Sequence, residues 1–251
     1  MNKIFLGIFV IIIIIFFINN TDKNDIKLYD KIYFINLEKR KDRYYRFNDA
    51  FQNSDITMNY ELFKAIDGKK IDISQYVTED TLEEINYIEK YKKRKYHYQL
   101  TKGAIGCSLS HFNIWKDILD NNIDSALILE DDANLPSNFS YLLNNYIKDI
   151  PSDYDIILLG CKCLDCTNYK KYRKVNRFWL THSYIITKKC IEKIYDKMFP
   201  IKQQIDSELS DLSDIINIYA LKQNIISQYS SKSDIQVPII NNVESFKNYH
   251  A

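Results

Sequence analysis

The sequence has little glycine, little proline and almost no net charge. Its 251 residues include 5 Gly and 4 Pro, and 34 Lys and Arg balance 33 Asp and Glu. With 46% hydrophobic and 14% aromatic residues, this composition excludes a disordered or collagen-like chain. The near-neutral balance lacks the concentrated positive field that holds a phosphate backbone, so nucleic-acid binding is not expected. A globular protein remains, long enough for one large α/β domain or two small ones.

The longest apolar run lies at the N-terminus, where residues 4–18 (IFLGIFVIIIIIFFI) contain no polar side chain. At 1.5 Å per residue the run spans about 22 Å, somewhat less than a hydrocarbon core of about 30 Å. No small-residue cleavage site follows, which favours an uncleaved signal anchor (residues 1–22) over a cleaved signal peptide or a buried core helix. The domain of residues 23–251 would then face a lumen or the exterior. The sequon at Asn138 would be usable only on that translocated side.

The five cysteines are unevenly distributed. Cys161, Cys163 and Cys166 form a cluster, whereas Cys107 and Cys190 stand alone. In a lumenal protein an odd number allows at most two internal disulfides and leaves one thiol. The cluster has the spacing of metal ligands, but no second Cys or His pair at the usual distance completes a four-ligand site. A disulfide or plain thiols are therefore favoured over a metal.

Strands and helices alternate along the chain after residue 30. Apolar, β-branched and aromatic runs predict strands at residues 31–37, 61–66, 126–129 and 155–159, and helical spacing predicts helices at 40–51 and 106–119. The Glu, Lys and Tyr mixture of residues 79–95 predicts a solvated helix and loop. This alternation indicates an α/β domain with a mostly parallel sheet and helices on both faces. Ligands of such sheets bind at the carboxyl ends of the strands.

Three acidic residues, Glu130, Asp131 and Asp132, follow the predicted strand of residues 126–129. Adjacent carboxylates at the end of a buried strand repel one another and lose hydration unless a cation is present. Oxygen ligands suit Mg²⁺ or Mn²⁺. In an extended chain Glu130 and Asp132 would point to one side and Asp131 to the other. The alternative is a solvated turn in which Asp132 caps the next segment.

Four segments in a fixed order resemble glycosyltransferase family 25. They are residues 34–43 (FINLEKRKDR), 65–68 (AIDG), 100–111 (LTKGAIGCSLSH) and 126–132 (ALILEDD). The combination of GCSLSH with LILEDD is the specific part, and weaker likeness extends the resemblance over nearly everything after residue 30. The family comprises bacterial lipooligosaccharide β-galactosyltransferases and collagen hydroxylysine galactosyltransferases.

The resemblance implies a GT-A-like, Rossmann-related fold and a sugar transfer that inverts the anomeric carbon. The implied donor is a UDP-sugar, usually UDP-galactose, and the acceptor is a glycan or a hydroxylated protein. Glu130, Asp131 and Asp132 match the family's acidic motif, which holds Mn²⁺ or Mg²⁺ against the donor diphosphate. A carboxylate or a His should take the proton of the attacking hydroxyl group.

Further candidate residues surround the acidic motif in the implied fold. The candidates for catalytic proton transfer are Asp206 and His111, and those for donor binding are Asn36, Arg40, Arg43, Asp67, Gly103 and Gln228. Several have plainer explanations. Arg43 can form an ion pair on a helix surface, His111 can be a satisfied core residue, and residues 205–214 (IDSELSDLSD) can be mostly a solvated helix face. Gly103 can let the backbone approach either a ligand or a neighbouring strand.

The sequence departs from the family pattern at two places. Ala104 stands where many members have an acidic or polar residue, and no proline precedes Asp206 in QQID. These departures motivate an alternative function, that of a catalytically silent, membrane-tethered member that binds glycans or assists assembly. A metal-dependent phosphotransferase has no support, because the sequence contains no Walker-type loop or kinase signature.

Overall fold

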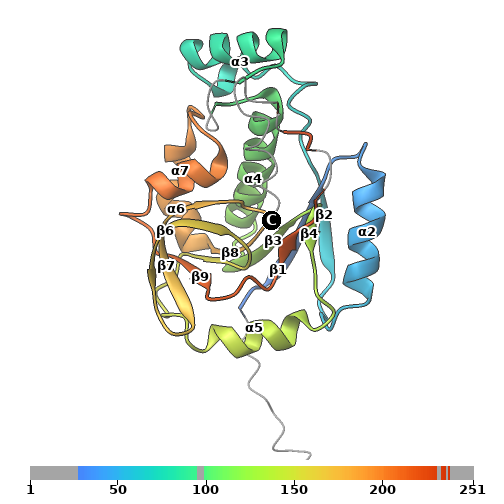
Figure 1. Ribbon diagram of the computed structural model, residues 1–251, viewed down its shortest axis with the longest axis vertical. Coiled ribbons are helices and arrows are strands. Elements are labelled where there is room, and N and C mark those ends of the chain that lie inside the picture. The colour runs from blue at the N-terminus through green and yellow to red at the C-terminus, as the bar shows by residue number, and fades with distance from the viewer. Residues whose placement is uncertain (1–27, 95–98, 231–232, 236, 238–251) are drawn as a thin grey trace, which may run out of the picture.

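The computed structural model of the protein describes residues 28–94, 99–230, 233–235 and 237 (Figure 1). The predicted membrane anchor, residues 4–18, lies outside these ranges. Among the described residues, no helix combines the length and the apolar character needed to cross a membrane.

An eight-stranded sheet has the strand order β2-β1-β3-β8-β5-β9-β7-β6. Its strands are β1 (Lys31–Asn36), β2 (Tyr60–Lys64), β3 (Ser125–Glu130), β5 (Ile156–Leu158), β6 (Lys162–Asn168), β7 (Tyr172–Trp179), β8 (Ser183–Thr187) and β9 (Ile218–Leu221). The short strands β4 (Ala133–Asn134) and β10 (Ser227–Gln228) pair separately and antiparallel. Only β7 and β8 run against the direction of the other strands of the large sheet. The sheet is therefore mixed but mostly of one direction.

Helices cover both faces of the sheet, so the predicted α/β class is confirmed (Figure 1). Helices α2 (Lys41–Gln52) and α5 (Phe139–Ile147) lie on one face, and α4 (Lys102–Asp120), α6 (Lys188–Ile194) and α7 (Ile205–Asp211) lie on the other. Helix α3 (Glu79–Tyr91) packs near the start of α4. Two single-turn 3₁₀ helices, Ser74–Tyr76 and Tyr195–Met198, complete the described elements.

Alternation along β3 explains why two hydrophobic cores form. Leu127 and Leu129 point into the core shared with α2 and α5, whereas Ala126 and Ile128 point into the core shared with α4. Successive side chains of a strand face opposite sides, so a fully apolar strand is stable only when both faces are covered.

Helix α4 begins four residues before the predicted start at residue 106. Thr101 is its N-cap, and the side-chain oxygen accepts the backbone N–H of Ala104 at 3.0 Å. Gly106 lets this helix pack directly on the preceding loop, because a Cβ there would overlap the carbonyl oxygen of Ile66 and the backbone nitrogen of Gly68. The glycine at position 106 therefore serves backbone packing.

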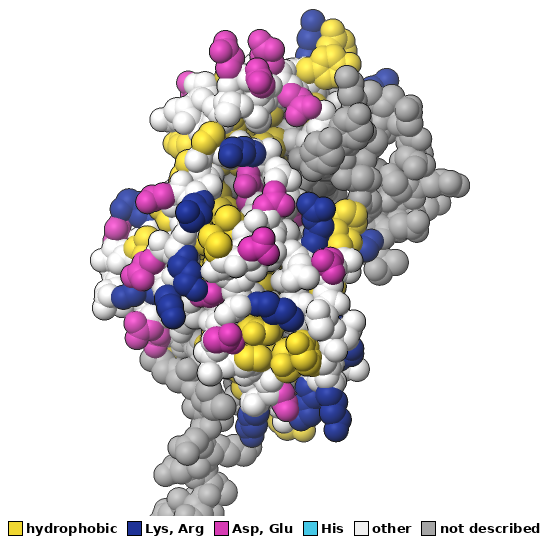
Figure 2. All heavy atoms as spheres, turned by 90° about the vertical axis from the view of Figure 1, so that its left-hand side faces the viewer, with side chains coloured by type: hydrophobic (Ala, Val, Ile, Leu, Met, Phe, Trp, Pro, Cys, Tyr) yellow, Lys and Arg dark blue, Asp and Glu magenta, His cyan; other side chains and the backbone are white. Residues whose placement is uncertain are grey.

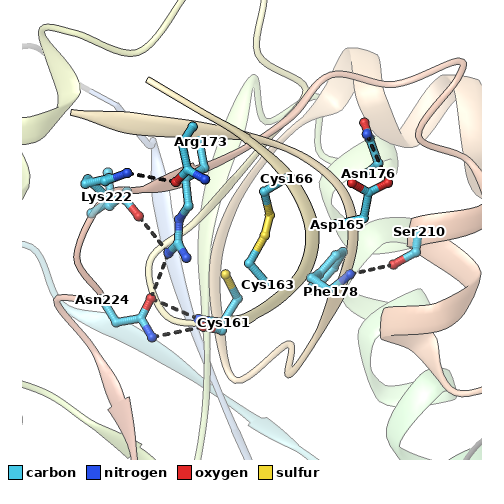
Figure 3. Close-up of a disulfide and its surroundings, with 12 residues drawn as sticks. Cys161, Cys163, Asp165, Cys166, Arg173, Asn176, Phe178, Ser210, Lys222 and Asn224 are labelled. Atoms are coloured by element: carbon cyan, nitrogen blue, oxygen red, sulfur yellow. Dashed lines mark hydrogen bonds between the residues drawn. A yellow bond between two sulfur atoms is a disulfide. The ribbon is translucent and has the colours of Figure 1, made fainter. Parts of the chain in front are cut away.

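Sequence reasoning missed the β6–β7 hairpin and the strands β8 and β9. The hairpin carries the cysteine cluster, in which Cys163 and Cys166 form a disulfide (Figure 3). Cys107, Cys161 and Cys190 are free. This pairing agrees with the disulfide alternative and not with a metal site at the cluster.

We expect Phe47→Ala to destabilise the protein by about 3–5 kcal/mol, the usual cost of emptying a buried phenylalanine site. Phe47 is fully buried on α2 and stacks on Phe34, with ring centroids 3.8 Å apart. The matched control is Tyr45→Ala, because Tyr45 lies on the same helix but is 66% exposed; it should change stability by less than about 1 kcal/mol. Urea unfolding of both variants measures the difference, and equal losses would contradict the assigned packing.

Candidate functional site

A pocket of about 410 Å³ lies at the carboxyl ends of β1 and β3. Its walls are the end of β1, the loop after β2, the first half of α4, the turn after β3, the end of β7, the start of α7 and the segment after β10. Its volume falls within the range of small-ligand sites, about 300–1,000 Å³. The pocket occupies the place that the strand order predicts for a ligand site.

Most of the candidate residues meet in this pocket. Its lining includes Arg43, Asp67, Gly103, His111, Glu130, Asp131, Asp132, Asp206 and Gln228. Two donor-binding candidates are not part of the lining. Asn36 lies behind the acidic turn and donates its amide to Asp131 at 2.8 Å. Arg40 is held by Asp42 and Asp234, with its Nη1 atom 2.5 Å from Asp234 Oδ2.

The three carboxylates have different partners. β3 ends at Glu130, and the chain turns at once, so Asp131 and Asp132 share one guanidinium nitrogen of Arg43 at 2.5 Å and 3.5 Å. Glu130 instead points to the α4 side, where its Oε1 atom lies 3.2 Å from His111 Nε2. Both Glu130 and Asp132 line the pocket, and after burial the charge of Glu130 contributes most to raising the pKa of Asp132. The expectation that Glu130 and Asp132 share a side stays a prediction.

Two arginines of α2 hold this turn. Arg43 is buried against the carboxylates and does not form the surface ion pair considered as its alternative. One helical turn later, Arg46 donates to the backbone carbonyls of Asp131 and Ala133 at 2.8 Å and 3.2 Å. Parallel pairing of β1 with β3 brings the start of α2 to the end of β3, which makes these contacts possible.

Asp132 is the least satisfied of the three carboxylates. Its Oδ2 atom accepts the Gln228 amide at 3.1 Å, but its buried Oδ1 atom has no hydrogen-bond partner. Burial, together with the charges of Glu130 and Asp131, raises the pKa of Asp132 to about 7, even though Arg43 opposes the shift. Burial likewise raises the pKa of Asp131. A single guanidinium therefore does not balance this cluster of negative charge.

A chain of buried hydrogen bonds fixes Glu130. Trp115 Nε1 donates to the Tyr184 hydroxyl at 3.0 Å, and that hydroxyl lies 2.8 Å from His111 Nδ1. If the Tyr184 proton goes to Nδ1, then Nε2–H donates to Glu130 and every polar atom of the chain is satisfied. Burial alone would raise the pKa of Glu130, but hydrogen bonds from His111 and Thr181 lower it below its ordinary value. His111 thus stands behind Glu130, and a direct catalytic role for it stays a prediction.

Asp206 lies at the start of α7, with its carboxylate fastened to the end of β7. Its Oδ2 atom accepts the Leu180 N–H at 3.0 Å, and Oδ1 accepts the Ser207 N–H at 2.8 Å. Burial raises the pKa of this carboxyl group above its ordinary value. Asp206 is half-buried, whereas Glu208 is buried and accepts the backbone N–H groups of Lys202 and Gln203 at 2.7 Å and 2.8 Å. The interpretation of this helix as a mostly solvated face is wrong for both residues.

The remaining candidates form the rim of the pocket. Asp67 accepts Lys39 Nζ at 3.0 Å and the Lys69 N–H at 3.2 Å, and the second contact places it in a turn. Gly103 packs against the chain after β10, since a Cβ there would lie 2.7 Å from the Asp234 carbonyl oxygen. A side chain at position 103 would thus push away the segment that closes this side of the pocket.

The residues present fit a divalent cation. A buried carboxylate oxygen without a partner, Asp132 Oδ1, lies in a group of three carboxylates, and hard divalent ions prefer oxygen ligands. A second grouping also contains Glu130, because potential ligand atoms of Cys107, His111 and Glu130 lie within 4.8 Å of one another. Burial raises the pKa of the Cys107 thiol, so this sulfur is protonated unless a cation displaces the proton. The oxygen set therefore fits Mn²⁺ or Mg²⁺ better than the set containing Cys107.

Comparison with known proteins identifies the family. A model of glycosyltransferase family 25 (LPS biosynthesis protein) matches residues 29–209, which include the acidic turn, α4 and Asp206. The chain belongs to this family. Three similar proteins carry related names, and the aligned part of this chain spans less than a third of the length of each.

Procollagen galactosyltransferase 2 of Mus musculus is 33% identical over 137 residues, which cover 53% of this chain and 21% of that protein. Its namesake in Homo sapiens is 27% identical over 190 residues, covering 70% of this chain and 29% of that protein. A glycosyltransferase 25 family member of Drosophila pseudoobscura pseudoobscura is 32% identical over 139 residues, covering 54% of this chain and 21% of that protein.

Sequence reasoning missed several residues of the site. Arg46 could have been found from its spacing, since it follows Arg43 by three positions on one helix face. Thr181 and Tyr184 lie in a stretch of weak family resemblance but were given no role. Trp179 carried no local signal, because the β6–β7 hairpin reaches the pocket only through tertiary pairing.

Asp132→Asn should stabilise the metal-free protein at pH 7.5 and have little effect below pH 4. The folded pKa of Asp132, about 7, lies above the unfolded value, so the unfolded chain ionises first as the pH rises. Ionisation of Asp132 therefore lowers the free energy of unfolding of the metal-free wild type between about pH 4 and pH 7, and the loss stays complete above pH 7. Melting temperatures of both proteins in EDTA, measured across this range, test the expectation.

Added Mn²⁺ should raise the melting temperature of the wild type at pH 7.5 and that of Asp132→Asn much less, because the variant lacks one carboxylate ligand. The same Mn²⁺ shift in both proteins would exclude Asp132 from the metal site.

Proposed function

We propose that this family 25 protein is a metal-dependent galactosyltransferase. It would move galactose from UDP-galactose, with inversion, to a glycan or a hydroxylated protein. The observation that carries the proposal is the buried, partnerless oxygen of Asp132 among three carboxylates at the end of a central strand. The family match and the relatives named procollagen galactosyltransferase support the type of reaction and the sugar.

Glu130, Asp131 and Asp132 would hold Mn²⁺ or Mg²⁺ on the floor of the pocket. When bound, the ion would offset the negative charge that develops on the departing diphosphate. Arg43 adds a fixed positive charge beside the carboxylates, and the hydrogen-bonded chain through His111 and Tyr184 keeps Glu130 in one orientation. Arg43 and Glu130 are thereby fixed in position before the donor binds.

Asp206 is the proposed general base. The acceptor oxygen attacks the anomeric carbon from the face opposite the diphosphate and forms the new C–O bond. The bond between that carbon and the phosphate oxygen breaks, and the nucleotide leaves with the electron pair. The hydroxyl proton passes to the Asp206 carboxylate, whose pKa is raised by burial and is therefore closer to that of an effective base.

The proposal includes the cellular setting of the domain. Residues 4–18 would anchor the chain in a membrane as an uncleaved signal anchor, with the catalytic domain on the lumenal or exterior side. The disulfide between Cys163 and Cys166 is compatible with an oxidising compartment of that kind.

Asp206→Asn should lower the rate of galactose transfer by about 10²–10⁴, the usual contribution of a general base. Donor affinity should change little, because the fold and the acidic turn remain. UDP release from UDP-galactose with Mn²⁺ measures the rate, and calorimetry with UDP measures donor binding. The control is Asp214→Asn, which removes one charge from an exposed position beyond the same helix.

A catalytically silent protein remains the competing function, motivated by Ala104 and by the sequence around Asp206. It predicts no hydrolysis or transfer with any UDP-sugar while glycans still bind. Wild-type UDP release that depends on Mn²⁺ and falls in Asp206→Asn would exclude it.

A further inference from the structure

One wall of the pocket comes from the β6–β7 hairpin, which no assigned donor residue belongs to. Leu164, Arg177 and Trp179 line the pocket from this hairpin. In the large sheet β7 and β6 lie at one edge, and β2 and β1 lie at the opposite edge. The acidic turn follows β3, between the two edges. The donor candidates Arg43 and Asp67 therefore occupy one side of the carboxylates, and the hairpin occupies the other.

The hairpin wall contains a bulge that is fixed by a disulfide. In the strand register Cys163 pairs with Phe178 and Asp165 pairs with Arg177, so Leu164 has no residue opposite it. The Cys163–Cys166 disulfide spans this irregular stretch (Figure 3). Bulges commonly re-aim side chains beside active sites. Here the re-aimed side chain, Leu164, is 41% exposed and lines the pocket.

The residues before and after Trp179 are hydrogen-bonded to α7, the helix that carries Asp206. The N–H of Phe178 donates to Ser210 Oγ on α7 at 3.2 Å (Figure 3), and the N–H of Leu180 donates to Asp206 Oδ2 at 3.0 Å. Ser210 in turn donates to the Asp206 carbonyl oxygen at 2.7 Å. The indole of Trp179 therefore sits on a segment that is fastened, one residue before and one residue after, to the helix of the proposed base.

Leu180 adopts an unusual backbone conformation to make this contact. Its φ angle is 79°, in the left-handed region that residues other than glycine rarely enter. Such conformations persist where the surrounding structure holds them, and they cluster at ligand sites. In this protein the conformation directs the Leu180 N–H at Asp206.

The side chains of this wall suit a saccharide. An indole offers a flat apolar surface for the C–H face of a sugar ring. Lys162 Nζ lies over the Trp179 ring, 5.1 Å from its centroid, so the sugar would stack on the opposite face of the indole. The face of the molecule on the α7 and hairpin side carries acidic and basic side chains interspersed (Figure 2). It lacks the single-sign charge that would select a polyanionic acceptor.

We propose that Leu164, Arg177 and Trp179 form the acceptor subsite. A saccharide acceptor stacks a ring on Trp179 and presents its hydroxyl group to Asp206, and the Cys163–Cys166 disulfide holds the wall in place. This inference rests on the proposed function, because it assigns the second substrate of the same reaction.

Trp179→Ala should raise the acceptor KM about tenfold, and with it the ratio of acceptor KM to donor KM, because the stacking surface is lost. Trp179→Phe, which keeps a flat ring, should restore most of the affinity. The substrates are UDP-galactose with Mn²⁺ and, as acceptors, the methyl glycosides of galactose, glucose, mannose and N-acetylglucosamine. A hydroxylysine-containing peptide serves as the non-saccharide acceptor. Tyr141→Ala removes an exposed aromatic residue of α5 and should change neither KM.

The disulfide gives a second, independent measurement. Dithiothreitol should raise the acceptor KM of the wild type. The Cys163→Ser/Cys166→Ser double variant should show the raised value without reductant and should not respond to it. Equal acceptor KM values for the oxidised and reduced wild type would overturn the role of the disulfide.

Failure of this inference can be told apart from failure of the proposed function. UDP release to water, without any acceptor, reports the reaction alone. If release occurs but Trp179→Ala leaves the acceptor KM unchanged, or only the peptide accepts galactose, the saccharide subsite is wrong. If no release occurs, the proposed function fails, and saturation-transfer NMR with the same glycosides decides the subsite. Ring-proton signals that disappear in Trp179→Ala support it, and their absence in the wild type overturns it.

Discussion

The rest of the site depends on the crowding of three carboxylates at the end of one buried strand. Glu130, Asp131 and Asp132 cannot all be solvated where β3 leaves the sheet, and their mutual repulsion must be offset by fixed positive groups, donors or a cation. The fold brings such groups from far along the chain. Arg43 and Arg46 come from α2, Asn36 from β1, His111 from α4 and Gln228 from β10. Even so, one oxygen of Asp132 keeps no partner, so the protein alone does not complete this arrangement.

Each carboxylate is held by a different part of the fold. Glu130 belongs to the α4 side, through a chain of buried hydrogen bonds that ends at the Trp115 indole. Asp131 belongs to the α2 side, and Asp132 is shared between α2 and the segment that begins with β10. The turn thus joins the two hydrophobic cores of the sheet at their common edge. A distortion of either core would therefore move the carboxylate oxygens of the acidic turn.

The sequence was sufficient for the first half of the domain and for the position of the acidic turn. The strand at residues 31–37 and the helices at 40–51 and 106–119 carry periodic apolar patterns, and the structure has an element at each. The second half was harder to predict. β6 contains almost no buried side chains, and β8 and β9 are short apolar strands whose position comes only from pairing with non-consecutive neighbours. The site shows the same limit. The sequence showed acidic residues next to a strand end, but the partners of each carboxylate come from α2, α4 and β10, and no local pattern indicated them.

The strand order has a consequence for synthesis on the ribosome. β9 lies inside the sheet, between β5 and β7, although it is the last of the eight strands in the chain. The β6–β7 hairpin leaves the exit tunnel before β9 has been synthesised. It cannot join the sheet until β9 pairs with both β5 and β7. Gln228 follows only after that, so the nascent protein exposes an unpaired strand edge and an open acidic turn until the chain as far as Gln228 has left the tunnel. A chaperone that shields this edge would act during that interval.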